Sequence, residues 1–237
     1  MKRKLSLITV LLLCLAGCDT YYMIGSLNPF YIERNITLNA KIEGSWLVKP
    51  LSIPSDSSSS SNAVIWGIAD TTSTWTIKQF ISKYVVKNRK GEDSAWYKPE
   101  NYYTAKLIRP TDTVAYKFKV VLFEVNHALY ADFVPANTDS LFKSRLTEHS
   151  FFELHTLARV TLAYNRMELS WLSAGSMKEM IEKKRVRIKY QWVNEARRFL
   201  LTATSDDLTK MIDRYGDQTR FIDWKNQQAR LELNRLN

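Results

Sequence analysis

Alternation between apolar and polar residues constrains the fold of this 237-residue chain more than any other feature of its sequence. The pattern begins at Lys41 and continues, with interruptions, for about 160 residues. In one segment Trp75 and Ile77 alternate with Thr76 and Lys78. A period of two is typical of half-buried β-strands, because successive side chains of a strand point to opposite faces. The sequence therefore predicts a mainly β domain.

The predicted strands are separated by segments that favour turns. They span residues 41–49, 64–69, 74–87, 102–109, 113–125, 128–134, 151–164, 166–171, 186–192 and 199–203. Asn126 and His127 are expected to form the turn of a hairpin. In the strand before this turn the apolar pattern changes phase at Val120-Val121, which predicts a β-bulge.

Three segments interrupt the alternation. Residues 88–101 are charged and contain Pro99, so we expect a loop there. Ser176 is followed by Glu179 in the spacing of a capping box, which predicts a short helix. A second short helix is expected to be capped by Ser205. Both predicted helices lie in the C-terminal half of the chain.

Successive hairpins at this spacing favour an antiparallel meander. Closing such a meander into a barrel removes its exposed strand edges, so we expect one closed barrel of about 8–10 strands. The barrel domain is expected to span residues 41–215. Residues 18–40 are expected to be a tether, and residues 216–237 a polar, weakly helical tail.

The first seventeen residues have the three regions of an export signal. Lys2, Arg3 and Lys4 precede an apolar run over residues 5–15, and a small-residue site ends at Cys18. The run is too short to span a bilayer core of ~30 Å. The site resembles the bacterial lipobox, which implies cleavage before Cys18, a diacylglyceryl group on its sulfur and N-acylation. The alternative is an ordinary signal peptide followed by a chance cysteine.

A chain processed at this site has 220 residues and no free thiol. Cys14 leaves with residues 1–17 and Cys18 carries lipid, so we expect neither a disulfide nor a thiolate metal site. We expect a cell-envelope lipoprotein of a diderm bacterium, anchored by acyl chains such as palmitate to the outer membrane and facing the periplasm. An inner-membrane or cell-surface location stays open.

The net charge of +10 falls to about +7 when residues 1–17 are removed. A basic protein often binds nucleic acid, but an exported, anchored chain does not meet it, and the sequence lacks a dense basic patch with interleaved aromatic residues. Attraction to anionic lipid headgroups is the expected consequence of the charge. A basic surface without a specific partner is equally compatible with it.

Gly44-Ser45-Trp46 lies on the first predicted strand. This segment resembles the Gly-x-Trp signature of lipocalins and other calycins. The resemblance implies that Gly44 lets the chain turn in closely and that Trp46 plugs the closed end of the barrel. Calycins also pack an arginine on this tryptophan, and the sequence offers no assignable candidate for it.

A longer resemblance, to uncharacterised bacterial lipoproteins with lipocalin-like barrels, covers roughly residues 41–215. It rests on the segments 121–123, 129–133, 155, 159–160, 169–172 and 200–204. The chain departs from that group in its few glycines and in the helix expected at residues 176–184, which interrupts the strands. The resemblance implies the fold and carries no catalytic residues.

The residues that most often perform catalysis are sparse. The three histidines, His127, His149 and His155, do not stand at metal-ligand spacing, so each is expected to be a surface or structural residue. The common hydrolase, metalloprotease and nucleotide-binding motifs do not occur. Asp206-Asp207 is explained by its place in the first turn of a helix. We therefore expect no enzymatic activity, no metal and no cofactor beyond the covalent lipid.

Two functions remain. The first is a binding module that holds a small apolar or lipid-like ligand inside the barrel. The inward residues expected to line it are Tyr103, Tyr116, Phe118, Leu129, Phe133, Val160 and Leu162. The alternative is an accessory lipoprotein that docks on a cell-envelope protein complex, with the same side chains filling the barrel. Six aromatic residues outside the predicted strands would be its anchors, or would instead cover the ends of the barrel: Tyr21, Tyr22, Tyr31, Trp96, Tyr97 and Trp224.

Overall fold

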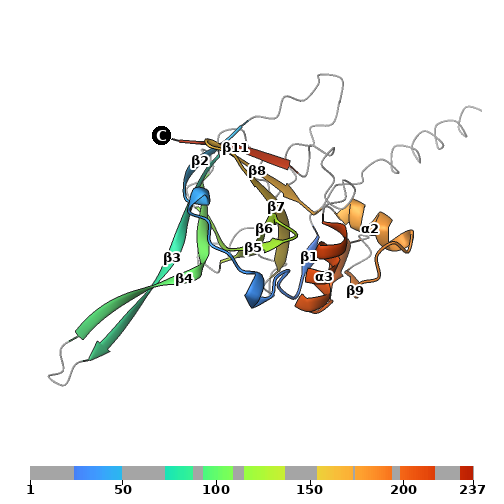
Figure 1. Cartoon of the computed structure of the whole chain (residues 1–237), viewed down its shortest axis with the longest axis horizontal. Helices are drawn as coiled ribbons and strands as arrows, with labels where there is room; N and C mark the ends of the chain where they lie inside the picture. The colour runs from blue at the N-terminus through green and yellow to red at the C-terminus, as the bar shows by residue number, and fades with distance from the viewer. Residues whose placement is uncertain are drawn as a thin grey trace, which may run out of the picture.

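The fold is built mainly from strands that pair with their neighbours in the sequence. The structure, a computed structural model, describes residues 24–49, 73–87, 93–108, 115–136, 154–172, 174–193, 198–216 and 230–236 (Figure 1). The strands are β1 (Gly25–Ser26), β2 (Gly44–Val48), β3 (Thr74–Lys87), β4 (Asp93–Ile108), β5 (Tyr116–Val125), β6 (Ala128–Pro135), β7 (His155–Leu162), β8 (Arg166–Trp171), β9 (Tyr190–Val193), β10 (Arg198–Leu201) and β11 (Arg230–Arg235). The helices are the 3-10 turns η1 (Glu33–Asn35) and η2 (Ala40–Ile42) and the α-helices α2 (Ala174–Glu182) and α3 (Ser205–Tyr215).

Eight of these strands close into an antiparallel barrel. Their order is β2-β3-β4-β5-β6-β7-β8-β11, and pairing of β11 with β2 completes the ring. Chain order matches spatial order except that β9, β10 and both α-helices intervene between β8 and β11. The predicted meander, its closure and the two helices in the C-terminal half are confirmed. The strand expected at residues 64–69 lies outside the described residues.

A short extension continues from the start of β7. β1 pairs antiparallel with β7 and parallel with β10, which in turn pairs with β9. α2 and α3 lie on this side of the barrel (Figure 1). Ile24 and Phe30 are buried here in a core that includes residues of both helices. The described part of residues 18–40 therefore packs on the domain instead of forming a loose tether.

β5 buries apolar residues on both faces, which explains its change of phase. Phe118 and Leu122 face the barrel interior, whereas Phe123 and Val125 belong to the second core beside the α-helices. β5 pairs with β6 in continuous register from Phe118 to Val125. The bulge expected at Val120-Val121 is therefore wrong, because the second core covers the outer face of a regular strand.

β3 has the bounds that were predicted, but β4 is much longer than expected. It begins at Asp93, so the loop predicted over residues 88–101 is wrong for residues 93–101. Pro99 is tolerated because, among the described strands, this part of β4 pairs only with β3 and has no neighbour on its other edge. A register shift in β3 between Gln79 and Ile81 lies opposite this segment.

The last barrel strand lies in the segment expected to be a weakly helical tail. Residues 217–229 lie outside the described residues, but Arg230–Arg235 form β11, so the prediction is wrong for them. The two leucines of β11 face the barrel interior. Its Glu232 forms ion pairs of 3.0 Å with Lys49 and Arg166, on the two flanking sides. Pairing with two strands distant in sequence thus overrides the local pattern.

Smaller differences concern element ends. α2 begins two residues before Ser176, so this serine is not its cap. Thr204 caps α3 in place of Ser205, because its side chain accepts a hydrogen bond from the Asp207 amide. Within the segment 186–192, regular strand begins only with β9.

Candidate binding surfaces

The Gly44–Trp46 segment forms the start of β2, beside the last strand. Gly44 has a φ of 133°, a value that favours glycine. Trp46 is fully buried, and its indole N–H donates to the Ile42 carbonyl oxygen at 2.9 Å. The Arg235 guanidinium lies 4.6 Å from the centroid of the Trp46 ring and donates to the Lys41 carbonyl oxygen. The calycin resemblance implied that an arginine packs on this tryptophan, and Arg235, which the sequence did not identify, makes such a contact.

All seven residues predicted to line a ligand site lie inside the barrel. Four are buried in its core: Tyr103, Phe118, Phe133 and Val160. Three are half-buried and pack against this core: Tyr116, Leu129 and Leu162. The hydroxyl of Tyr103 accepts a hydrogen bond from the Asn39 amide at 2.8 Å, and burial raises the pKa of Tyr103. The packing of the interior decides whether these side chains line a ligand site or fill the barrel.

Aromatic side chains pack against one another across this interior. Phe133 lies between Trp75 and Trp171, with ring centroids 6.0 Å and 5.7 Å apart, and Trp75 stacks on Phe118 at 5.9 Å. Trp75 and Trp171 are 1% exposed and Phe133 is 2% exposed, so no space of the size of a water molecule adjoins them. Around these three rings the interior is therefore closely packed with side chains, whereas Tyr116, Leu129 and Leu162 keep partial exposure.

Trp75 and Trp171 were not among the predicted interior residues, although both stand on predicted strands. Their indole N–H groups are buried without a hydrogen-bond partner. Such a group costs about 1–3 kcal/mol when desolvated. Aromatic packing, and not hydrogen bonding, therefore stabilises the part of the interior around Trp75 and Trp171.

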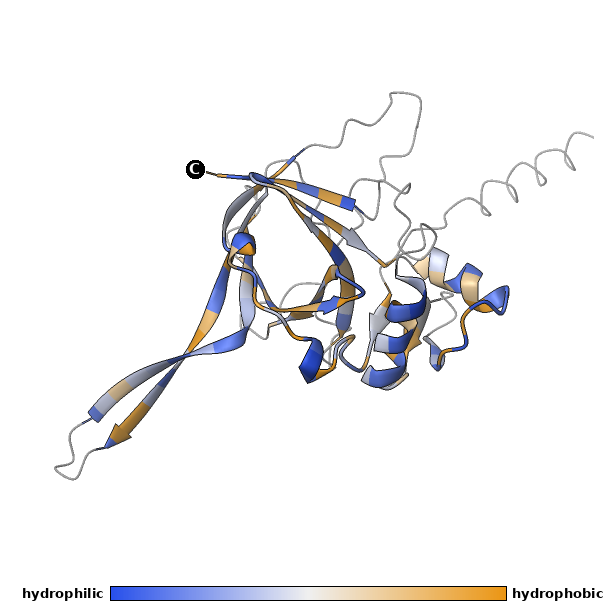
Figure 2. Cartoon of the chain, viewed as in Figure 1, coloured by the Kyte–Doolittle hydropathy of each residue, from blue (hydrophilic) through white to orange (hydrophobic). Residues whose placement is uncertain are grey.

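A two-stranded hairpin projects from the barrel (Figure 1). We define the arm as residues 78–87 and 93–102, which pair with neither β2 nor β5; within it, residues 81–87 pair with residues 93–99. Large exposed apolar or aromatic side chains occur on both of its strands. Figure 2 shows orange, hydrophobic sequence at the far end of β3. Trp96 and Tyr97, two of the six predicted anchors, are exposed on this arm, although they lie on a strand and not in a loop. Tyr31 is half-buried against the second core, and Tyr21, Tyr22 and Trp224 lie outside the described residues.

A buried carboxylate lies where the barrel meets α3. Asp132 on β6 is fully buried, and its Oδ2 accepts from the Phe30 amide at 3.1 Å and lies 2.9 Å from His155 Nδ1. Thr209 of α3 donates to the Phe30 carbonyl oxygen at 3.3 Å, which links the three segments. Burial raises the pKa of Asp132, although the hydrogen bond from His155 opposes this effect. His155 is thus buried and held by its contact with Asp132.

The other described histidine, His127, stands on the turn between β5 and β6 with a fully exposed side chain. Within the described ranges no group of three or more His, Cys, Asp or Glu residues could hold a metal ion. Cys18 and His149 lie outside those ranges.

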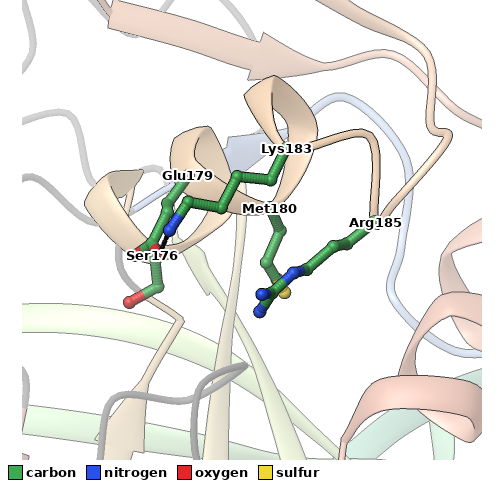
Figure 3. Close-up of a pocket in the computed structure, with 5 residues that line it drawn as sticks. All are labelled: Ser176, Glu179, Met180, Lys183 and Arg185. Carbon is green, nitrogen blue, oxygen red and sulfur yellow. Dashed lines mark hydrogen bonds and ion pairs between the residues drawn. The ribbon is translucent and has the colours of Figure 1, made fainter.

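A small depression lies beside α2 (Figure 3). Its lining residues are Ser176, Glu179, Met180, Lys183 and Arg185, and the ammonium group of Lys183 forms an ion pair with Glu179. Its volume of about 10 Å³ holds roughly one water molecule. The depression is therefore too small for an organic ligand.

The geometry defines this protein as a closed, eight-stranded antiparallel barrel, consistent with a lipocalin-like architecture. No family model, no curated protein and no solved structure matches the chain. Of the helices in the described parts of the chain, none has the length and apolar character needed to cross a membrane.

Proposed function

We propose that the protein is a non-enzymatic accessory lipoprotein whose filled barrel is a rigid scaffold for docking on a cell-envelope protein complex. The packed aromatic interior carries this proposal. A barrel that carries a ligand needs internal space, and here Trp75, Phe133 and Trp171 occupy that space. The large exposed side chains of the arm supply a surface on which a partner can bind.

Membrane attachment through lipid on Cys18 is part of the same proposal and is supported by the lipobox-like sequence at residues 15–18. The first described residue, Ile24, is only six positions later, so the anchor would hold the domain close to the bilayer. The full-length chain should partition into the detergent phase of a bacterial extract, and Cys18→Ser should move it to the aqueous phase. Equal partitioning of both forms would reject the lipid anchor.

The function itself is tested by native mass spectrometry of a soluble form that begins at Asp19 and is purified without detergent. We expect the bare protein mass, unchanged after incubation with an extract of envelope lipids. A discrete adduct that organic solvent removes would instead identify a carrier and reject the scaffold proposal.

A further inference from the structure

The arm extends beyond the part of β3 and β4 that closes the barrel. β2 pairs with β3 only over Thr74–Ile77, and β5 pairs with β4 only over Tyr103–Leu107. Ten residues of each strand therefore extend beyond the barrel, a length of about 30 Å at the rise of a β-strand. A free two-stranded hairpin is only marginally stable in water, so this one needs its own stabilising contacts.

Those contacts lie on one face of the arm. Tyr84 stacks on Trp96 with ring centroids 4.4 Å apart. The Glu100 carboxylate accepts hydrogen bonds from Ser82 at 2.7 Å and from Tyr84 at 3.2 Å, and the bond from Ser82 lowers the pKa of Glu100. The arm is thus formed before any partner binds, which lowers the entropic cost of binding.

On the opposite face, apolar side chains are exposed within the described part of the chain. We call the side chains of Ile81, Val85, Ala95, Tyr97 and Pro99 the apolar arm face; they lie together because paired residues of adjacent strands point to the same side. Ile81 and Val85 are each 54% exposed and Tyr97 is 63% exposed. Contiguous exposed apolar residues of this kind mark interaction sites.

The charges of the arm select its partner. Lys83 and Lys87 stand among the apolar residues on the same face, and both are exposed. The arm contains four basic residues and two acidic ones; Asp93 stands opposite Lys87 on the same face, and the carboxylate of Glu100 is already engaged on the other face. This excess positive charge repels the arm of a second copy and attracts an acidic surface.

A bilayer core does not fit this surface. The outer edges of both arm strands leave backbone N–H and C=O groups unpaired by any described strand, and open sheet edges do not occur in hydrocarbon. The arm also projects from the side of the barrel opposite β1, near which the described chain begins (Figure 1). A lipid anchor on the preceding residues would therefore leave the arm pointing away from its membrane.

We propose that the apolar arm face is the docking surface, and that its occupant is an acidic protein with an apolar groove. The groove takes Val85 and Tyr97, and carboxylates at its rim pair with Lys83 and Lys87. This inference rests on the proposed scaffold function and names the surface and the partner chemistry for it.

The test places a photo-crosslinking amino acid at Val85 of the full-length protein, in cells that produce it naturally. Matched positions are Tyr164 on the β7–β8 turn and Trp192 on β9, both exposed. We expect one discrete protein adduct from Val85 and none from the two matched positions. Lys83→Glu with Lys87→Glu should abolish the adduct.

The charge control reverses Lys189 and Lys210, which are exposed elsewhere on the chain, and should leave the adduct intact. Mass spectrometry of the adduct should locate the crosslink on a net acidic surface. The purified partner should bind the Lys83→Glu, Lys87→Glu variant at least about tenfold more weakly than the wild type, a loss of about 1.4 kcal/mol.

The other outcomes each overturn the inference. A Val85 adduct of twice the mass of the chain would identify a second copy, and an adduct with lipid alone would identify a membrane surface. A protein adduct from Tyr164 or Trp192 but not from Val85 would leave the scaffold function standing and reject the arm as its surface. Absence of any protein adduct from all three positions would reject both.

Discussion

Replacing Phe133 by alanine tests whether the barrel is filled. Phe133 is 2% exposed, and its ring lies within 6.4 Å of those of Trp75, Phe118 and Trp171, measured between centroids. Truncation of a core phenylalanine typically costs about 3–5 kcal/mol, because transfer energy is lost and a cavity remains. The three large aromatic neighbours hold one another in place and cannot easily move into the cavity that alanine would leave. We therefore expect a loss of unfolding free energy in the upper half of that range.

The measurement is urea unfolding of the soluble form that begins at Asp19, followed by tryptophan fluorescence. The transition midpoint should fall while the slope stays constant. Benzene should raise the midpoint of Phe133→Ala, because a dry apolar cavity binds a ligand of that size, and should not affect the wild type. Tyr164→Ala is the matched control; its side chain is 94% exposed, and the change should stay within about 0.5 kcal/mol.

The opposite pattern would refute the filled barrel. If Phe133→Ala costs less than about 1 kcal/mol, the ring was not part of a close-packed core. If benzene stabilises the wild type as well, the interior already contains a usable cavity. Both results together would favour the ligand carrier over the scaffold.

Three further changes test other contacts. Arg235→Ala should lower the free energy of unfolding by about 1–3 kcal/mol, because it removes the cation–π contact with Trp46 and a hydrogen bond; an unchanged urea midpoint would contradict this. Gly216→Ala should cost about 1–3 kcal/mol, because a Cβ atom there would lie 2.3 Å from the Tyr130 hydroxyl oxygen; a variant as stable as the wild type would refute the clash. Burial raises the pKa of Asp132, so the folded state binds the carboxyl proton more tightly than the unfolded chain does. Protonation of Asp132 therefore stabilises the folded state. This stabilisation is complete below about pH 4 and is lost as the pH rises through the raised pKa. The stability of the wild type relative to Asp132→Asn should therefore fall with rising pH in denaturation series, and a pH-independent difference would count against the raised pKa.

The parts of the fold that depend on local chemistry were predictable. The bounds of β3 and β8 follow from alternation alone. Asn126 and His127 both have positive φ values, 51° and 59°, as a tight hairpin turn requires. The periodic face of α3 was visible because the buried residues of a surface helix recur at its own period.

The parts that depend on distant partners were not predictable. β11 is six residues long, and it is a strand because β2 and β8 flank it. The alternation of Leu231, Leu233 and Arg235 is the only local signal of this strand, and it is too short to outweigh the polar segment before it. Arg235 could therefore be assigned to Trp46 only after the barrel was closed.

The arm was missed for a reason that bears on its role. Only its β4 half was missed: Lys98 and Pro99 lower the strand signal of residues 93–101, and the same kinds of residue discourage pairing between exposed edges. A solvent-exposed hairpin built from strong strand formers would tend to aggregate through its edges. Its sequence therefore contains weaker strand formers and resembles that of a loop. The stacked pair of Tyr84 and Trp96 restores the lost stability within one copy of the chain. Disrupting that stack should therefore unfold the arm before the barrel, whereas changing Lys83 should leave the arm folded and alter only what binds it.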